Sequence, residues 1–185
     1  MAEQNADRAR LLELIQRDAF QTGEFTLASG QKSHYYIDGR LLTLSSDGAH
    51  VLAQVILAMI EGERIDAVGG MTMGADPIIG AVLAVADLQG RTLAGFICRK
   101  EQKQHGTGRL VEGNLRPGHR VLMVEDVVTT GGSTLRAMDA VEAVGGEVMR
   151  VIAMVDRLAG ASEAFEKRGV RFTPIFTVKD LGVEP

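Results

Sequence analysis

Apolar residues in the first third of the chain predict two helices separated by a hairpin. A first helix is indicated by apolar positions at helical spacing with charges between them: Leu11, Leu12, Ile15 and Ala19. The segment 25–40 contains two short runs around Gly30 and predicts an antiparallel hairpin with its turn at that glycine. A second helix is expected to begin near the capping residues Ser46 and Asp47 and to end at Gly62. Its buried stripe would be Leu52, Val55, Ile56, Met59 and Ile60.

From residue 65 the pattern changes to short apolar runs that alternate with helical segments. The runs, which predict strands, are IDAVGG, LAGFIC, VLMVED, VMRVIAMVD and the segment 171–178. Helices are expected over 78–88, 133–144 and 161–167, and a polar, glycine-containing stretch covers 99–117. This alternation predicts an α/β fold with a central parallel sheet flanked by helices on both faces. Ligands in such sheets bind beyond the carboxyl ends of the strands.

Length and charge restrict the class of protein further. The 185 residues suit one domain over 1–185, and no linker or repeat divides them. The net charge of -4 argues against broad binding to nucleic acid or to an anionic membrane. A single cysteine, Cys98, excludes an intrachain disulfide. With a polar N-terminus and no apolar run of bilayer length, these features predict a cytoplasmic location.

The segment Val121 to Thr134 carries the strongest functional signal. An apolar strand ends in two carboxylates, and a turn of threonines and glycines and then a predicted helix follow. Glycines let the backbone approach a ligand, and a helix N-terminus suits a phosphate. The hydroxyls of Thr129, Thr130, Ser133 and Thr134 would add donors. Carboxylates do not favour the binding of a phosphate, because both groups are anionic. Glu125 and Asp126 therefore need another partner, such as ribose hydroxyls or hydrated Mg²⁺. A plain strand-turn-helix connection is the alternative, and the clustering of these residue types disfavours it.

This segment resembles the ribose-phosphate signature of the type I phosphoribosyltransferases. The resemblance implies that Glu125 and Asp126 face the ribose hydroxyls of phosphoribosyl pyrophosphate (PRPP). It also implies that Thr129 to Ser133 wrap the 5′-phosphate. The residues of the turn that are expected to bind PRPP are Val127, Val128, Thr129, Thr130, Gly131, Gly132 and Ser133.

A basic loop at 99–114 is the second signal. Alone, such a run is usually a solvated loop, but beside a ribose-phosphate site it is a candidate lid that brings cations to a pyrophosphate. Its sequence is similar to the mobile loop R-K-x-x-K-x-H-G of the orotate phosphoribosyltransferases, with matches at Arg99, Lys100, Lys103, His105 and Gly106. The first four are therefore expected to bind PRPP, and Lys103, with Asp126, is expected to be catalytic. In that family the loop crosses to the neighbouring subunit, which implies a homodimer with shared active sites.

The hairpin resembles the base-side motif of the same family, T-L-x-S-G-x-x-S-x-x-Y/F, through Ser29, Gly30, Ser33 and Tyr36. Residues 1–45 would then form part of a hood over the base. Tyr36, Thr129 and Arg157 are expected to bind orotate, and an arginine fork matches the carboxylate of that base. Ordinary strand packing is the alternative for the tyrosine, and a surface position for the arginine. The chain departs from many members at Ala28 and Met73, where they carry lysine.

The resemblance implies a reaction as well as a site. Ribose 5-phosphate would pass from PRPP to N1 of orotate, releasing pyrophosphate and giving orotidine 5′-phosphate for pyrimidine synthesis. The cofactor would be Mg²⁺, held mainly by substrate and water and not by a cage of protein ligands. Two alternatives remain at this point: a phosphoribosyltransferase for a purine base, and a non-catalytic regulator that senses ribose phosphates. The second would be expected to show a basic, nucleic-acid-binding face, which the acidic chain does not indicate.

Overall fold

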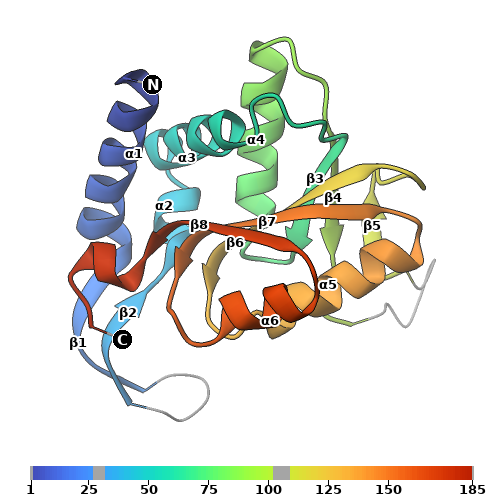
Figure 1. Cartoon of the computed structure of the whole chain (residues 1–185). Coiled ribbons are helices and arrows are strands. Elements are labelled where there is room, and N and C mark those ends of the chain that lie inside the picture. Colours follow the sequence, from blue (N-terminus) through green and yellow to red (C-terminus); the bar gives the residue numbers. More distant parts are fainter. Residues whose placement is uncertain (1, 27–31, 102–108, 185) are drawn as a thin grey trace.

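The computed structural model of the chain describes residues 2–26, 32–101 and 109–184, and is built on one central sheet (Figure 1). The strand order is β5-β4-β3-β6-β7-β8. Five strands run parallel: β3 (Ala67–Met71), β4 (Ala94–Cys98), β6 (Arg120–Val128), β7 (Glu147–Asp156) and β8 (Arg171–Thr177). The short edge strand β5 (Val111–Gly113) pairs antiparallel to β4. The predicted α/β fold with a parallel sheet is confirmed.

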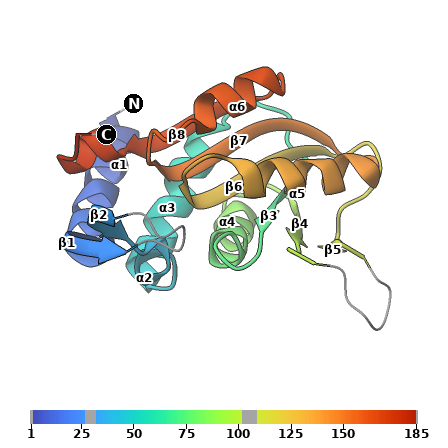
Figure 2. The same ribbon diagram turned by 90° about the horizontal axis from the view of Figure 1, so that it is seen from below.

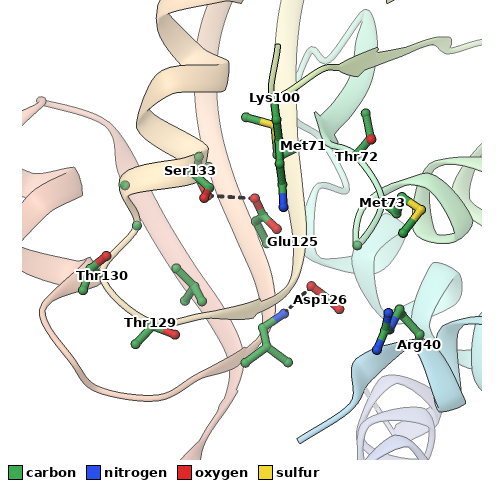
Figure 3. Close-up of a pocket in the computed structure, with 16 residues that line it drawn as sticks. Arg40, Met71, Thr72, Met73, Lys100, Glu125, Asp126, Thr129, Thr130 and Ser133 are labelled. Atoms are coloured by element: carbon green, nitrogen blue, oxygen red, sulfur yellow. Dashed lines mark hydrogen bonds between the residues drawn. The ribbon is translucent and has the colours of Figure 1, made fainter. Parts of the chain in front are cut away.

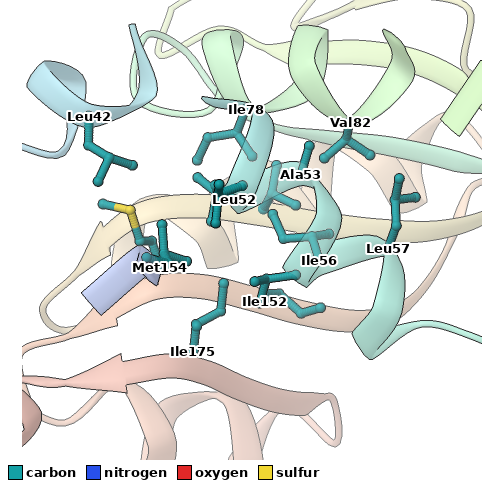
Figure 4. Close-up of a cluster of buried hydrophobic side chains, with 14 of the residues drawn as sticks. Leu42, Leu52, Ala53, Ile56, Leu57, Ile78, Val82, Ile152, Met154 and Ile175 are labelled. Atoms are coloured by element: carbon teal, nitrogen blue, oxygen red, sulfur yellow. The ribbon is translucent and has the colours of Figure 1, made fainter. Parts of the chain in front are cut away.

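Helices cover both faces of this sheet (Figure 2). One face carries α1 (Ala2–Leu14), α3 (Ser46–Met59) and α4 (Asp76–Leu88), and the other carries α5 (Gly132–Ala143) and α6 (Ala161–Lys167). Successive side chains of a strand point to opposite faces. Leu122 and Val124 of β6 accordingly pack in the core beneath α3 and α4. Figure 4 shows side chains of this core. Val121 and Met123 pack in a second core beneath α5 and α6.

The N-terminal segment forms a smaller unit beside the sheet. After α1 the chain continues as a π-helical turn, Ile15–Ala19, and a two-stranded hairpin of β1 (Phe20–Thr26) and β2 (Lys32–Ile37). The hairpin begins five residues earlier than predicted, because β2 needs an N-terminal partner of matching length and Phe20 pairs with Ile37. The predicted turn at Gly30 lies outside the described residues.

Other boundaries also differ from the sequence prediction. Three short elements were not predicted: α2 (Gly39–Thr43), β5 and a 3₁₀-helix after β8 (Val178–Leu181). Helix α3 is capped by Ser45, whose hydroxyl accepts a 3.1 Å hydrogen bond from the Gly48 N–H, and not by the two residues that follow it. Most important for function, β6 continues two residues beyond the predicted run VLMVED, to Val128, so that the two carboxylates lie inside the strand and not at its end. The register with β7 holds this extension, since Val127 pairs with Val155.

The first helix is attached to the last strand of the sheet. Nη2 of Arg8 in α1 donates a 2.9 Å hydrogen bond to the carbonyl of Ile175 in β8. The same guanidinium lies 4.7 Å from the ring centroid of Phe176, a cation–π contact. Among the helices that the structure describes, none combines the length and the apolar character that a bilayer crossing requires.

Candidate active site

A pocket of about 740 Å³ opens at the carboxyl ends of β3 and β6 (Figure 3). Ligands of parallel sheets bind at this edge, beyond the carboxyl ends of the strands. The lining residues come from α2, the loop after β3, the end of β4 and the whole β6–α5 connection: Arg40, Met71, Thr72, Met73, Gly74, Lys100, Glu125, Asp126, Val127, Val128, Thr129, Thr130, Gly131, Gly132, Ser133 and Thr134. The structure thus brings together the acidic pair, the phosphate turn and one residue of the basic loop.

The pleat of β6 sends its two carboxylates in different directions. Glu125 follows Val121 and Met123 on the α5 face, where Oγ1 of Thr134 donates a 2.9 Å hydrogen bond to its Oε1. Glu125 is 8% exposed, and this burial raises the pKa of its carboxyl to about 7. Thr134, expected to be a donor to a bound anion, is 2% exposed and directs its hydroxyl to Glu125 instead. That prediction is wrong, because Thr134 lies on the buried side of the first turn of α5.

Asp126 lies on the opposite face, between α2 and the loop after β3. A Cβ atom on Gly74 would lie 2.5 Å from its Oδ1, and one on Gly39 would lie 2.8 Å from its Cβ. Both glycines are therefore required for the backbone to fit against this carboxylate. The N–H of Val127 donates a 2.8 Å hydrogen bond to Oδ1. Burial nevertheless raises the pKa of Asp126, as it does that of Glu125.

The turn between β6 and α5 has the features of an anion site. Gly131 is the N-cap of α5 and has a φ of 76°, a conformation that favours glycine. A Cβ atom there would also lie 3.0 Å from the Phe165 ring. Because Gly131 provides no side-chain hydrogen bond to the first turn of α5, the N–H groups of that turn are available to a ligand. The hydroxyls of Thr129, Thr130 and Ser133 border the same space (Figure 3).

The residues predicted from the basic loop separate in the structure. Lys100 lines the pocket, whereas Arg99 makes an ion pair of 3.3 Å with Glu112 on β5 and does not line it. Lys103 and His105 lie outside the described residues. The loop as a whole therefore remains a prediction, of which the structure places the first two positions.

Of the residues predicted to bind a base, Thr129 lines the pocket, whereas Tyr36 and Arg157 do not. Nε of Arg157, which follows β7, donates a 3.1 Å hydrogen bond to the phenol oxygen of Tyr35. Its backbone N–H donates to the carbonyl of Val128, which ties it to the end of β6. Tyr36 points to the other face of β2 and packs on Phe25, with ring centroids 5.6 Å apart. The sequence prediction singled out Tyr36, while the contact to the arginine is made by its neighbour.

Several pocket residues carried no expected role. Thr72 and Gly74 follow β3 at its carboxyl end, so the strand-end rule was the available signal for them. Arg40 belongs to the unpredicted helix α2, and no motif pointed to it. Among the described residues, no group of three His, Cys, Asp or Glu side chains is placed to hold a metal ion.

Comparisons with known proteins show the family to which the chain belongs. The model of the phosphoribosyl transferase domain family matches residues 39–177, a span that contains the whole described pocket. The chain belongs to the phosphoribosyltransferase family. An orotate phosphoribosyltransferase from Rhodopirellula baltica is 46% identical, over 98% of this chain and 97% of that protein. Within the family, the chain is therefore a member of the orotate phosphoribosyltransferases, as the sequence predicted.

Solved structures lead to the same group. The crystal structure of Mycobacterium tuberculosis H37Rv orotate phosphoribosyltransferase in complex with Fe(III) dicitrate has a TM-score of 0.85 and 41% identity, and covers 96% of this chain and 99% of that one. The structure of the same enzyme in complex with PRPP has a TM-score of 0.81 and 38% identity, with the same coverage. The expected type I phosphoribosyltransferase fold is confirmed.

Proposed function

We propose that the chain transfers ribose 5-phosphate from PRPP to N1 of orotate, giving orotidine 5′-phosphate and pyrophosphate. The observation that carries this proposal is the placement of the acidic pair and the glycine turn in one pocket. A phosphate site beside carboxylates suits a phosphorylated polyol. The relatedness to orotate phosphoribosyltransferases supplies the identity of the base.

In this proposal the 5′-phosphate binds between Thr129 and Ser133. Backbone N–H groups of the turn, the dipole of α5 and three hydroxyls would provide its donors. The ribose hydroxyls would then face Asp126 and Glu125, which lie next to the turn along β6. Asp126 can accept from a hydroxyl on the open side of the pocket. Glu125, already bonded to Thr134, would serve mainly by its charge.

The base is assigned to the space near Arg157. Its guanidinium lies over the Tyr35 ring at 4.8 Å from the centroid and would pair with the orotate carboxylate. Thr129 lines the pocket on the same side and would contact the base. Tyr36, on the face of β2 opposite to Tyr35, is also proposed to bind the base.

The chemistry requires no nucleophilic side chain. The departing pyrophosphate leaves an oxocarbenium-like ribose, so catalysis rests on positioning and on charge. Lys100 lines the pocket and would neutralise the charge of the leaving group. Lys103 and His105, which follow in the same loop but lie outside the described residues, would contribute in the same way. The carboxylates of Asp126 and Glu125 are oxygen donors that fit Mg²⁺ bound mostly by substrate and water. When bound, Mg²⁺ supplies Lewis-acid stabilisation of the pyrophosphate.

We also propose a homodimer in which the loop 99–114 of one protomer completes the site of the other. The support is the resemblance of the loop to the crossing loop of the family. Arg99 fits this arrangement, since it does not line the pocket of its own chain, whereas Lys100 does and would act in its own site.

One assay tests the proposal. The purified protein is mixed with PRPP, Mg²⁺ and either orotate or adenine, and consumption of the base is followed. We expect the protein to consume orotate and not adenine, and we expect the Asp126→Asn variant to lose this turnover. Consumption of adenine would favour the purine alternative, and no turnover of either base under any metal condition would favour a ribose-phosphate sensor.

A further inference from the structure

The charges that line the pocket are unevenly distributed. Among the described lining residues, the cations are Arg40 and Lys100, and the anions are Glu125 and Asp126. Figure 3 shows Thr129, Thr130 and Ser133 at one side, the carboxylates in the middle, and Arg40 with Thr72 and Met73 at the other side. Lys100 reaches in beside Met71 and Glu125. Arg40 is thus the described cation at the end of the pocket that is remote from the phosphate turn.

Arg40 is held in a defined orientation by a residue two positions before it. Its Nε and Nη2 donate hydrogen bonds of 2.8 and 2.9 Å to the two carboxylate oxygens of Asp38. Asp38 also caps α2 by accepting 3.1 Å from the Arg40 backbone N–H. No hydrogen bond to Nη1 occurs within the described parts of the chain. The side chain is 50% exposed, so a guanidinium fixed by one edge presents its other edge to the pocket.

A structural purpose alone explains this arrangement poorly. An ion pair as exposed as that of Arg40 with Asp38 contributes little to stability. Asp38 would cap α2 without the arginine, because the cap uses a backbone N–H. Met73, next to Arg40 in the pocket wall, is 67% exposed and brings no charge. Among the described side chains, Arg40 is therefore the one that can offer a positive charge to an anion bound at this end of the pocket.

PRPP carries phosphate groups at both ends of its ribose, which allows the two ends of the pocket to be assigned. If the 5′-phosphate occupies the turn and the hydroxyls face the carboxylates, the pyrophosphate on C1 extends toward Arg40. We infer that Arg40 binds the pyrophosphate group of PRPP through the free edge of its guanidinium, as a preset cation for the leaving group. This inference rests on the proposed function, and it assigns a residue to the departing half of the substrate.

Calorimetry with two separate ligands tests the inference. Pyrophosphate with Mg²⁺ reports on the assigned end of the pocket, and ribose 5-phosphate reports on the turn. We expect Arg40→Ala to raise the Kd for pyrophosphate about tenfold, the effect of removing a hydrogen bond to a charged group. Arg40→Lys should lose less, since it keeps the charge but not the fork. The Kd for ribose 5-phosphate should stay within about twofold in both variants.

Arg17→Ala is the matched control. Arg17 also forms an ion pair with a neighbouring aspartate, Asp18, but lies on the surface outside the pocket. Its removal changes net charge equally and should leave both dissociation constants unchanged. A Met73→Lys substitution in the Arg40→Ala background should restore part of the pyrophosphate affinity, because it returns a cation to the same wall. This rescue separates lost charge from local misfolding.

The outcomes distinguish the inference from the proposed function. Unchanged pyrophosphate binding in Arg40→Ala overturns the inference, even if orotate is consumed. An equal loss for pyrophosphate and ribose 5-phosphate overturns it too, because the arginine would then act on the whole pocket. If wild type binds both ligands but does not consume orotate, the proposed function fails, while the assignment of Arg40 to a pyrophosphate subsite is still decided by the variant.

Discussion

The guanidinium of Arg157 is held against Tyr35 in two ways. Its Nε donates a 3.1 Å hydrogen bond to the phenol oxygen, and its Cζ lies 4.8 Å from the ring centroid. The two residues are 122 positions apart, and their contact joins the hairpin to the end of β7. The arginine is thereby oriented before any substrate arrives, which lowers the entropic cost of binding a carboxylate.

Tyr35→Phe should weaken the binding of orotate and leave that of PRPP unchanged. Phenylalanine keeps the ring that lies under the guanidinium, but it removes the hydrogen bond that fixes the orientation of Arg157. We expect the KM for orotate to rise about threefold to tenfold with little change in kcat, the range for one hydrogen bond to a charged group. Steady-state kinetics in both substrates provide the check. Equal increases in both KM values would contradict a role confined to the base.

The sequence was sufficient for the five parallel strands of the sheet but not for the parts that surround the site. Strands read as apolar runs because both faces of a parallel sheet are buried, and β6 was located on this basis. Its predicted end at Asp126 is two residues short, because the threonines and glycines that follow indicate a turn, whereas Val127 and Val128 remain in the ladder with β7. The partner of Thr134 could not be predicted, because it depends on which side of α5 faces β6.

Arg40 shows a second limit of prediction from sequence. A short helix such as α2 has too few residues for a periodic pattern, so neither the helix nor its pocket residue was visible. The base-side tyrosine was assigned one position away from the contact observed, since adjacent residues of β2 point to opposite faces and only the packing decides between them.

Burial of Glu125 should make stability and activity respond to pH in opposite directions. Its pKa is about 7 in the folded chain against an ordinary value of 4.5. The folded state therefore binds the proton more tightly, and this contribution to stability is present below pH 4.5 and lost as the pH rises through 7. Relative to Glu125→Gln, the wild type should lose on the order of 3 kcal/mol of unfolding free energy across this window.

Urea unfolding of both proteins between pH 4.5 and 8 measures that difference. Over the same range kcat/KM for PRPP should increase in the wild type, because the charged carboxylate is the form proposed to face the ribose and Mg²⁺. A pH-independent difference in stability between the two proteins would contradict the raised pKa. Glutamine is the suitable replacement, since it can still accept the hydrogen bond from Thr134.

Gly74→Ala should abolish most activity, although it adds a single methyl group. The new Cβ would lie 2.5 Å from Oδ1 of Asp126, so either the carboxylate or the loop must move. A shift of this kind at a reacting centre costs about a hundredfold in rate. Gly80→Ala is the control, because a Cβ on Gly80 in α4 has no neighbour within 4 Å. It should retain full activity and gain about 0.5–1 kcal/mol of stability from helix propensity.

Lys103→Ala should reduce kcat more than it changes the KM for orotate. In the proposed function this lysine neutralises the leaving pyrophosphate, so its charge matters most in the transition state. Loss of such a group lowers kcat by about 10²–10³. Lys167→Ala, at the end of α6 and away from the pocket, is the control for charge alone. Wild-type turnover in Lys103→Ala would remove the loop from the mechanism.

Mixing two inactive variants tests the shared site of the proposed dimer. Lys103→Ala keeps an intact pocket, and Asp126→Asn keeps an intact loop. After subunit exchange, a mixed dimer would contain one site with both wild-type parts, so about a quarter of the wild-type activity should return. Activity that stays at the level of the separate variants would show that each chain uses its own loop.

The bond from Arg8 to Ile175 has a consequence for the order in which the protein assembles. Helix α1 is synthesised well before β8, whose residues provide the partners of Arg8. Until then the guanidinium of Arg8 has neither the carbonyl of Ile175 nor the ring of Phe176. Domains of this size fold as units. Arg8 therefore gains both partners only after β8 has been synthesised, and a nascent chain that stops before Ile175 would leave this side of α1 unattached.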